Sequence, residues 1–382
     1  ALAERDWERL EQLLDLKPAS ASGAVPPLAR IEAARATGQL GVAQDLGSEA
    51  LERDPANDEL HLRLSTDLLA SATSVIARDV LFERGVAAGH EQGVRIQVWQ
   101  TPRLRVALDL AFSFQHSADE GQLRGVPGVD RDATLSLLLR RGVEASDGET
   151  EIRLGRRIGM AGFTTAGLRI ARPLGPRLSG SAGLAVHERA YDSVPLAIAG
   201  HKDEARMNLH YAPTGREYVN AQLWSARYHT QGGTYVGSGG GAYVEAAYRL
   251  RIEYPELAVR LSRTLSHYSA ADYADAASAA LSADGTIPPG SFFLPQGFRM
   301  WGVNVAIGGD TRETRSRALR PFADLGRSVN SLSGSGYNWL IGAGGSLIGP
   351  DHASIYWLRS KGGGGTNATV REAGFRYQYF FD

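Results

Sequence analysis

The sequence of 382 residues contains no cysteine, so disulfides, thiolate metal sites and cysteine nucleophiles are all excluded. It also lacks any run of about 18 apolar residues, which a transmembrane helix requires. Lysine occurs only at Lys17, Lys202 and Lys361, so arginine carries almost all of the positive charge. The net charge of −1 argues against a nucleic-acid-binding protein, which normally has a basic excess.

The first seventy residues have the apolar spacing of helices. Helices are expected over Leu2–Leu14, Pro27–Leu40 and Val42–Arg53, and from an Asn57 cap to about Leu69. The run Ala50–Asn57 resembles the end of a tetratricopeptide repeat. Because such repeats bury their faces against neighbouring repeats, we interpret residues 1–72 as the end of a longer array. An unrelated small helical bundle is the alternative.

Beyond about Ser74 the apolar period changes from 3.6 residues to two. In Arg103–Gln115 every second residue is apolar, and the residues between them are charged, polar or small. Several such segments run for ten to thirteen residues, about the length with which a tilted strand crosses a bilayer. Strands of a soluble β-sandwich also alternate, but they average only five or six residues. The pattern therefore predicts a transmembrane β-barrel.

Sixteen antiparallel strands are expected in residues 73–382, an even number, as in bacterial single-chain barrels. They are expected to begin near Val75, Val94, Leu104, Ala133, Glu151, Thr165, Leu178, Glu204, Glu217, Gly241, Glu256, Phe298, Arg315, Gly336, Ala353 and Val370. Connections after even-numbered strands are short, whereas those after odd-numbered strands are mostly longer. Outer-membrane barrels have short periplasmic turns and long external loops, so both chain ends and the helices are expected in the periplasm.

The polar face of these strands predicts an arginine-rich lumen. We expect it to be lined by Arg95, Arg105, Asp109, Arg140, Arg153, Arg157, Arg206, Glu245, Arg249, Arg251, Glu253, Arg260, Arg320, Asp324 and Arg376. Arginine outnumbers acid in this set by 11 to 4. The set forms either a selective track for a hydrated polymer or salt-bridge ladders without selectivity.

The longest external connection, Ser269–Gln296, carries only acidic charge. Its lid residues are expected to be Asp272, Tyr273, Asp275 and Asp284. We expect it to fold inward as a constriction, with a short alanine-rich helix within Ala271–Leu281. A disordered surface loop is the alternative.

Signatures of enzymes are missing. No GxSxG, HExxH, Walker or CxxC motif occurs. Gly237–Ala242 fits the dinucleotide pattern G-x-G-x-x-A, but strand-like sequence follows it where a helix is required. His187 and His210 are expected to face the lumen as hydrated polar residues. We therefore expect no enzyme, catalytic residue, cofactor or metal site.

The last strand alternates the aromatic residues Phe375, Tyr377, Tyr379 and Phe381 with other residues. This resembles the aromatic terminal strand of outer-membrane barrels, although Asp382 follows the last aromatic residue. With its repeat-like start, the whole chain resembles the exopolysaccharide export porins, which include the PelB, PgaA and BcsC types. The arginine-rich composition, the acidic loop and the ending favour the PelB type.

This resemblance implies passive export of an exopolysaccharide across the outer membrane of a Gram-negative bacterium during biofilm formation. For the PelB type the polymer is a cationic amino-sugar chain. Implied partners are outer-membrane lipids, a periplasmic polysaccharide-modifying enzyme bound by the repeats, and a PelC-like ring of outer-membrane lipoproteins. Alternatives are an anion-selective porin, an alginate- or cellulose-type porin, and a plugged-barrel adhesin or receptor.

An arginine-rich lumen repels a cationic polymer, whereas the acidic loop attracts one. We therefore hypothesise that the arginines near the periplasmic ends of the strands meet an acidic partner protein rather than the polymer.

Overall fold

The structure is a computed structural model that describes residues 26–36, 40–69, 72–101, 103–140, 148–175, 177–252, 254–272, 275–309, 311–313, 315–316, 318–364 and 368–381. Three helices come first: α2 (Pro27–Ala36), α3 (Leu40–Arg53) and α4 (Asp58–Leu69). Among the helices of the described residues, none is long and apolar enough to cross a membrane. The helix expected over Leu2–Leu14 lies outside the described residues.

The three helices pack into a small layer of their own. Ile31 and Ala34 of α2 are buried against Ala43 and Ala50 of α3 and against Leu60 of α4. Asn57 caps α4 as expected, because its Oδ1 accepts a hydrogen bond from the Leu60 amide at 3.2 Å. Whether these helices end a longer repeat array stays a prediction.

Sixteen antiparallel strands follow and close into one barrel, which confirms the expected fold. They are β1 (Thr73–Arg84), β2 (Ala87–Thr101), β3 (Leu104–Ser117), β4 (Val129–Arg140), β5 (Glu149–Ile158), β6 (Gly162–Gly175), β7 (Leu178–Arg189), β8 (Gly200–Tyr211), β9 (Glu217–Thr230), β10 (Tyr235–Arg251), β11 (Leu257–Ala270), β12 (Phe298–Ile307), β13 (Arg320–Asn330), β14 (Gly334–Gly345), β15 (Asp351–Lys361) and β16 (Thr369–Phe381). The ring closes where β1 pairs with β16, from Thr73 opposite Phe381 to Arg84 opposite Val370.

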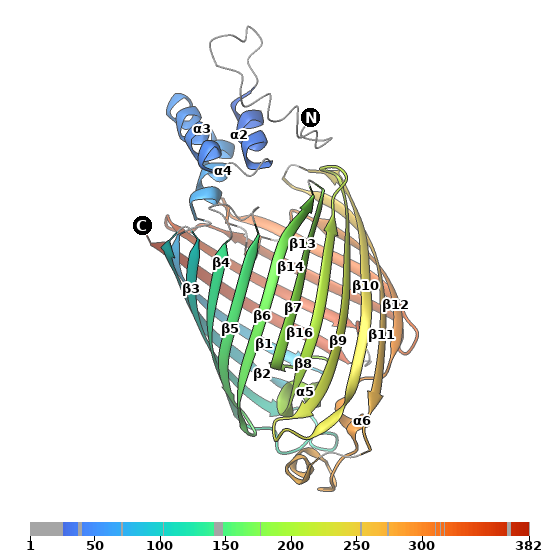
Figure 1. The fold of residues 1–382 in the computed structure, drawn as a ribbon. Helices are drawn as coiled ribbons and strands as arrows, with labels where there is room; N and C mark the ends of the chain where they lie inside the picture. The colour runs from blue at the N-terminus through green and yellow to red at the C-terminus, as the bar shows by residue number, and fades with distance from the viewer. Residues whose placement is uncertain are drawn as a thin grey trace.

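The barrel has two different ends (Figure 1). Helices α2–α4 and the C-terminus lie at one, which we call the helix end. Longer connections lie at the other, the loop end, and contain α5 (Val194–Ala199), the 3-10 helix η2 (Ala276–Leu281) and α6 (Gly290–Phe293). The helical segment and the C-terminus therefore share one end, as the sequence predicted.

Strand β13 begins at Arg320, five residues later than expected, because the preceding turn folds inward. There the Thr311 carbonyl lies 2.8 Å from Nε2 of the buried His352, and the Ser354 hydroxyl donates to the Arg312 carbonyl at 3.1 Å. Alternation alone does not distinguish such a turn from a strand.

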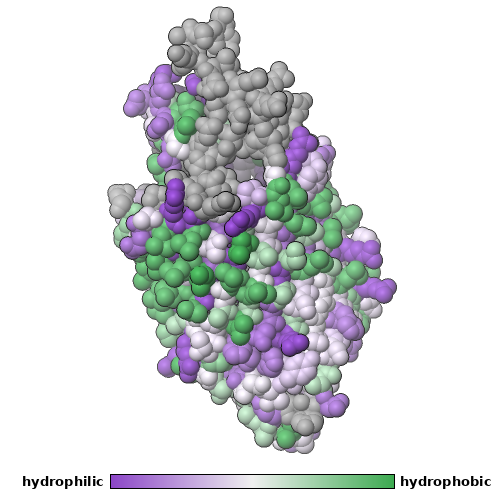
Figure 2. Space-filling view, viewed as in Figure 1, coloured by the Kyte–Doolittle hydropathy of each residue, from purple (hydrophilic) through white to green (hydrophobic). Residues whose placement is uncertain are grey.

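The two faces of the wall differ as the period of two predicts. Leu108, Phe112 and Phe114 of β3 are exposed on the outer face, whereas Ala107 and Ser113 are buried on the inner face. Figure 2 shows apolar residues gathered on the outer surface toward the helix end, and polar residues toward the loop end. An apolar outer band around a polar interior is typical of a barrel in a membrane.

The glycine run 237–241 serves packing within β10. A Cβ atom at Gly239 would lie 2.5 Å from the Tyr268 ring, and one at Gly241 would lie 2.8 Å from the Trp224 ring. Both glycines therefore make room for aromatic rings that lie against the wall, and the run does not precede a helix.

We predict that a charge on the outer face destabilises the barrel and one on the inner face does not. Met207 of β8 is 57% exposed and pairs with the apolar Leu223 of β9. Met207→Arg should lower the free energy of unfolding by about 2–4 kcal/mol in lipid vesicles, because it places a cation in hydrocarbon. Asn220→Arg is the control, because Asn220 donates to the lumenal Glu245. Equal losses in the two variants, measured by denaturant titration, would contradict the assignment of the faces.

Candidate functional site

The structure pairs most of the arginines predicted for the lumen with acidic side chains. Seven of the eleven expected arginines make ion pairs. These are Arg95–Asp109 (3.7 Å), Arg140–Glu149 (3.1 Å), Arg153–Glu188 (3.9 Å), Arg157–Asp130, Arg206–Glu204 (2.5 Å), Arg249–Glu256 (3.1 Å) and Arg260, which pairs with Glu245 (3.8 Å) and Asp324. The expected excess of arginine is therefore largely balanced.

Five of these acids were missing from the sequence-based set: Asp130, Glu149, Glu188, Glu204 and Glu256. Asp130 and Glu149 lie where strands begin, and a register shift between Ala185 and Glu188 breaks the alternation of β7. At strand ends and bulges the alternation of residues does not reliably assign a side chain to the inner or the outer face of the barrel.

Two cavities in the lumen bring predicted residues together. One of about 520 Å³ is lined by Arg95, Arg105, Asp109 and Arg376. A second of about 280 Å³ is lined by Arg153 and Arg206 together with Glu188 and Glu204.

The remaining predicted wall residues have separate positions. Arg251 donates to the Tyr254 carbonyl at 3.2 Å and is exposed at the helix end. Arg320 lies over the Tyr254 ring, 4.6 Å from its centroid. Glu253 lies outside the described residues.

Uncharged polar and aromatic side chains line another part of the lumen. A cavity of about 480 Å³ is bordered by Arg169, Ser181, Asn208, His210, Asn220, Gln222 and Tyr243. His210 faces this cavity, as expected, with Nδ1 2.7 Å from Asn220 Oδ1. Hydroxyl and amide groups beside aromatic rings form a surface suited to a hydrated, hydroxyl-rich chain.

An apolar core lies at the loop end. It is formed by Ala87, Leu123, Ala190, Leu196, Ile198, Ala199, Ala226, Tyr228, Val236, Leu281, Phe293 and Leu294. Ala87 belongs to β2 and Val236 to β10, which lie eight strands apart and thus on opposite sides of a ring of sixteen. The core, which we call the plug, therefore spans the mouth of the barrel.

Hydrogen bonds join the connections that form the plug. The Gln231 amide donates to the Ala199 carbonyl at 2.7 Å, and its side chain donates to the Ile198 carbonyl at 2.7 Å. The Arg124 amide donates to the Leu281 carbonyl at 3.0 Å, and the Ser193 hydroxyl donates to the Phe293 carbonyl. These bonds satisfy backbone groups that the plug removes from water.

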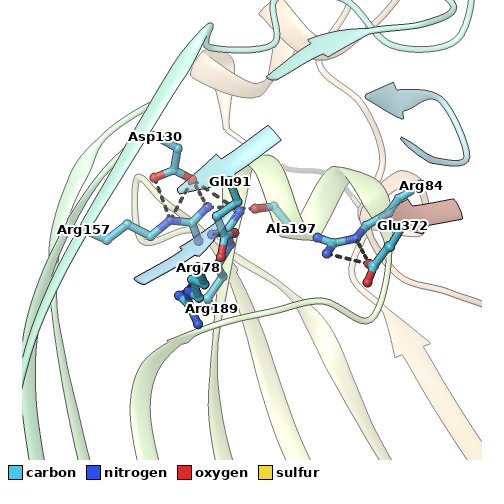
Figure 3. Close-up of polar contacts among 8 residues, drawn as sticks. All are labelled: Arg78, Arg84, Glu91, Asp130, Arg157, Arg189, Ala197 and Glu372. Carbon is cyan, nitrogen blue, oxygen red and sulfur yellow. Dashed lines mark hydrogen bonds and ion pairs between the residues drawn. The ribbon is translucent and has the colours of Figure 1, made fainter. Parts of the chain in front are cut away.

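A buried ion pair ties the plug to the wall (Figure 3). The Arg157 side chain of β5 is completely buried, and its Nε donates to both carboxylate oxygens of Asp130 at 3.0 Å. Its Nη2 donates to the Ala197 carbonyl of α5 at 2.8 Å. Arg189 adds ion pairs to Asp130 at 3.7 Å and to Glu91 of β2 at 3.5 Å. These contacts link α5 and the end of β7 to β2, β4 and β5.

The acidic lid residues have different environments. Asp275 caps η2 by accepting bonds from the Ser278 amide at 3.0 Å and from its hydroxyl at 2.8 Å, and it also accepts from the Thr230 hydroxyl at 2.5 Å. Partial burial raises the pKa of Asp275, but these hydrogen bonds outweigh it and bring the pKa below its ordinary value. Hydrogen bonds from Ser282 and Thr286 lower the pKa of the exposed Asp284 to about 2.

The other lid expectations have mixed outcomes. The helix expected within Ala271–Leu281 is only the 3-10 helix η2, because Asp275 caps it four residues later than the expected start. Asp272 is exposed, and Tyr273 lies outside the described residues.

The lumenal position expected for His187 stays a prediction, because the residue lies at the register shift of β7. Its ring Nδ1 lies 3.0 Å from the Thr164 carbonyl of β6, and its backbone has φ +54° at the register shift of β7.

The closed ring, the apolar outer band and the polar inner wall define an outer-membrane β-barrel of the porin class. The chain belongs to the family described as "PelB, C-terminal beta barrel domain", which matches residues 89–380.

None of the curated proteins matches the chain significantly. A solved structure titled "Bacterial polysaccharide outer membrane secretin" has a similar fold, with a TM-score of 0.58 and 10% identity over 82% of this chain and 99% of that chain. OccAB4 of Acinetobacter baumannii has a TM-score of 0.40 and 9% identity over 81% of this chain and 97% of its own.

We predict that breaking the buried pair loosens the plug. Arg157→Met should lower the free energy of unfolding by about 3 kcal/mol, because Asp130 stays buried without its main partner. Arg157→Met combined with Asp130→Leu should recover most of the loss. Arg371→Met is the control, because Arg371 and Glu83 are about half exposed and such pairs contribute under about 1 kcal/mol. Similar losses for the two single variants in denaturant titrations would contradict this role.

We predict that acid loosens η2 through Asp275. A carboxylate with a lowered folded-state pKa contributes stability above its ordinary pKa of 3.8, and this contribution is lost as the pH falls through the folded value. The hydrogen-exchange rate of the η2 amides, corrected for the intrinsic rate at each pH, should therefore be roughly five-fold higher below pH 3.8 than above it. Asp275→Ala should show the faster exchange at every pH, and Asp284→Ala should behave like wild type. A flat wild-type profile would be inconsistent with the cap.

Proposed function

We propose that the barrel is an export porin through which an exopolysaccharide passes passively across the outer membrane. Membership in the PelB barrel family is the observation that carries this proposal. The helix end would face the periplasm and the loop end the cell exterior, in line with the short turns at the helix end.

The charge balance of the lumen favours a polymer over a selected small anion. An anion-selective pore needs arginines without acidic partners, whereas here Arg153, Arg206 and Arg260 each have at least one. The same pairing lowers the repulsion expected for a cationic amino-sugar chain. The Pel-like polymer of the sequence analysis is therefore compatible with this wall, and we propose it as the substrate.

The paired arginines also weaken the hypothesis of an acidic partner at the periplasmic rim. Arg140 and Arg249 already pair with Glu149 and Glu256. Docking of a polysaccharide-modifying enzyme and of a PelC-like lipoprotein ring is instead proposed for the α2–α4 layer, where Val42 and Leu68 are exposed.

A core that spans the mouth from β2 to β10 distinguishes this barrel from a general diffusion porin. The plug has to move for a chain to leave, so the proposed export includes an opening step. A plugged adhesin or receptor also has a closed mouth, but it needs no conducting state.

We predict that wild-type protein in planar bilayers is mostly silent and that deletion of residues 270–295 gives larger currents. This deletion removes Leu281 and Phe293 from the plug. A deletion of Gly363 and Gly364 is the control, because neither residue belongs to the core.

The ion selectivity of the opened channel tests the proposed charge of the polymer. Weak or cationic preference would support a path for a cationic polymer, and strong anion preference would favour an acidic one. If the protein lacking residues 270–295 conducts no current, although its heat-dependent migration in electrophoresis shows a folded barrel, the result would favour the plugged receptor or adhesin.

A further inference from the structure

Strand β7 leaves the barrel wall near the loop end. Its pairing with β6 ends at Val186 opposite Ala166, whereas its pairing with β8 continues to Arg189 opposite His201. The tip of the β7–β8 hairpin, which carries α5, is therefore separated from β6.

His187 lies at this separation in a strained backbone conformation. With φ +54°, it is the only non-glycine residue with positive φ in the described part of the chain. Such a conformation costs roughly 1–3 kcal/mol and persists where the surroundings enforce it, often at ligand sites.

Three metal-ligating side chains meet at this point. The ligand atoms of His187, His201 and Asp203 all lie within 4.8 Å of one another. His201 is only 3% exposed, and its buried Nδ1 has no hydrogen-bond partner. An imidazole nitrogen buried without a partner is costly, which makes a missing ligand the simplest explanation of its position.

The hydrogen bonds of His187 and Asp203 leave one ligand atom of each side chain free to bind a metal ion. The Thr164 carbonyl accepts only, so His187 Nδ1 at 3.0 Å carries the proton and Nε2 keeps its lone pair. The Asp203 Oδ1 accepts from the His187 backbone amide at 2.8 Å, which fixes the carboxylate and leaves Oδ2 for a cation. A carbonyl that holds the second nitrogen of a ligating histidine is a regular feature of metal sites.

We propose that His187, His201 and Asp203 form a binding site for a divalent transition-metal ion, with Zn²⁺ as the best match. Two imidazoles and one carboxylate are a common protein ligand set for zinc, whereas Mg²⁺ and Ca²⁺ prefer oxygen ligands alone. The His229 ring stacks on that of His201, with 5.4 Å between the ring centroids, but His229 is not one of the three residues whose ligand atoms meet.

The position of the site gives it a structural consequence. His187 belongs to β7, and His201 and Asp203 belong to β8, on either side of α5. A bound ion therefore fastens the two strands at the base of the hairpin that carries α5 into the plug.

The test uses the full chain without an affinity tag, after treatment with a chelator. Titration with Co²⁺ should give visible d–d bands that saturate at one ion per chain, and Zn²⁺ should abolish them by displacement. Two variants preserve the fold: His187→Asn, because asparagine tolerates positive φ, and His201→Phe, which keeps a ring against Phe163, 5.0 Å away.

Both variants should weaken metal binding at least ten-fold, as should Asp203→Asn. His267→Ala is the matched control, because His267 is exposed on β11. Zn²⁺ should also slow amide hydrogen exchange in residues 187–203 of the wild type and of His267→Ala, but not in the three variants of the site. Absence of stoichiometric binding by wild type, or unchanged affinity in His187→Asn and His201→Phe, would overturn the site and leave the rings as packing.

Discussion

The closed ring of backbone hydrogen bonds is the constraint on which the rest of the structure depends. In hydrocarbon an unpaired amide or carbonyl costs several kcal/mol, so a sheet crosses a membrane only if it has no edge. The pairing of β1 with β16 over their whole lengths removes that edge. Once the ring is closed, strand alternation sends one residue to the outer face and the next to the lumen. Only the inner wall and the two ends then remain for function.

On the inner wall, charge is balanced locally. Most ion pairs join residues of the same or nearby strands, such as Arg95 of β2 with Asp109 of β3, although Arg189 of β7 reaches Glu91 of β2. Partly hydrated pairs of this kind contribute little stability, but they prevent arginine from giving the lumen a strong net potential. Beside Asn208, Gln222 and Tyr243, they form a wall that is wet without strongly preferring either sign.

Much of the fold was predictable from the sequence because the membrane imposes a simple pattern. A face against lipid has to be apolar along a whole strand, and β3 shows this in Leu108 and Phe112. All sixteen strands were expected for that reason, and Asn57 was identified from its capping chemistry.

The site was less predictable because it depends on contacts between residues that lie far apart in the sequence. Arg157 was among the residues expected in the lumen, but its partner Asp130 lies 27 residues earlier and its second acceptor, the Ala197 carbonyl, lies 40 residues later. No local pattern specifies such distances. The bulge at His187 reverses the expected alternation, and the inward fold of Thr311 looks like strand in the sequence. The departures therefore concentrate where the chain leaves the regular wall.

The plug poses an energetic question of its own, because a closed state that is too stable would prevent export. Burial of Leu196, Leu281 and Phe293 favours closure by roughly 1.5–3 kcal/mol for each side chain. The Arg157–Asp130 pair adds less than its geometry suggests, since both groups regain water when the plug opens. The pair thus determines how α5 sits when the mouth is closed, while the apolar core supplies most of the stability of that state. A chain in the lumen opens the mouth only to the extent that it binds the open state more tightly, and the polar wall offers it such contacts.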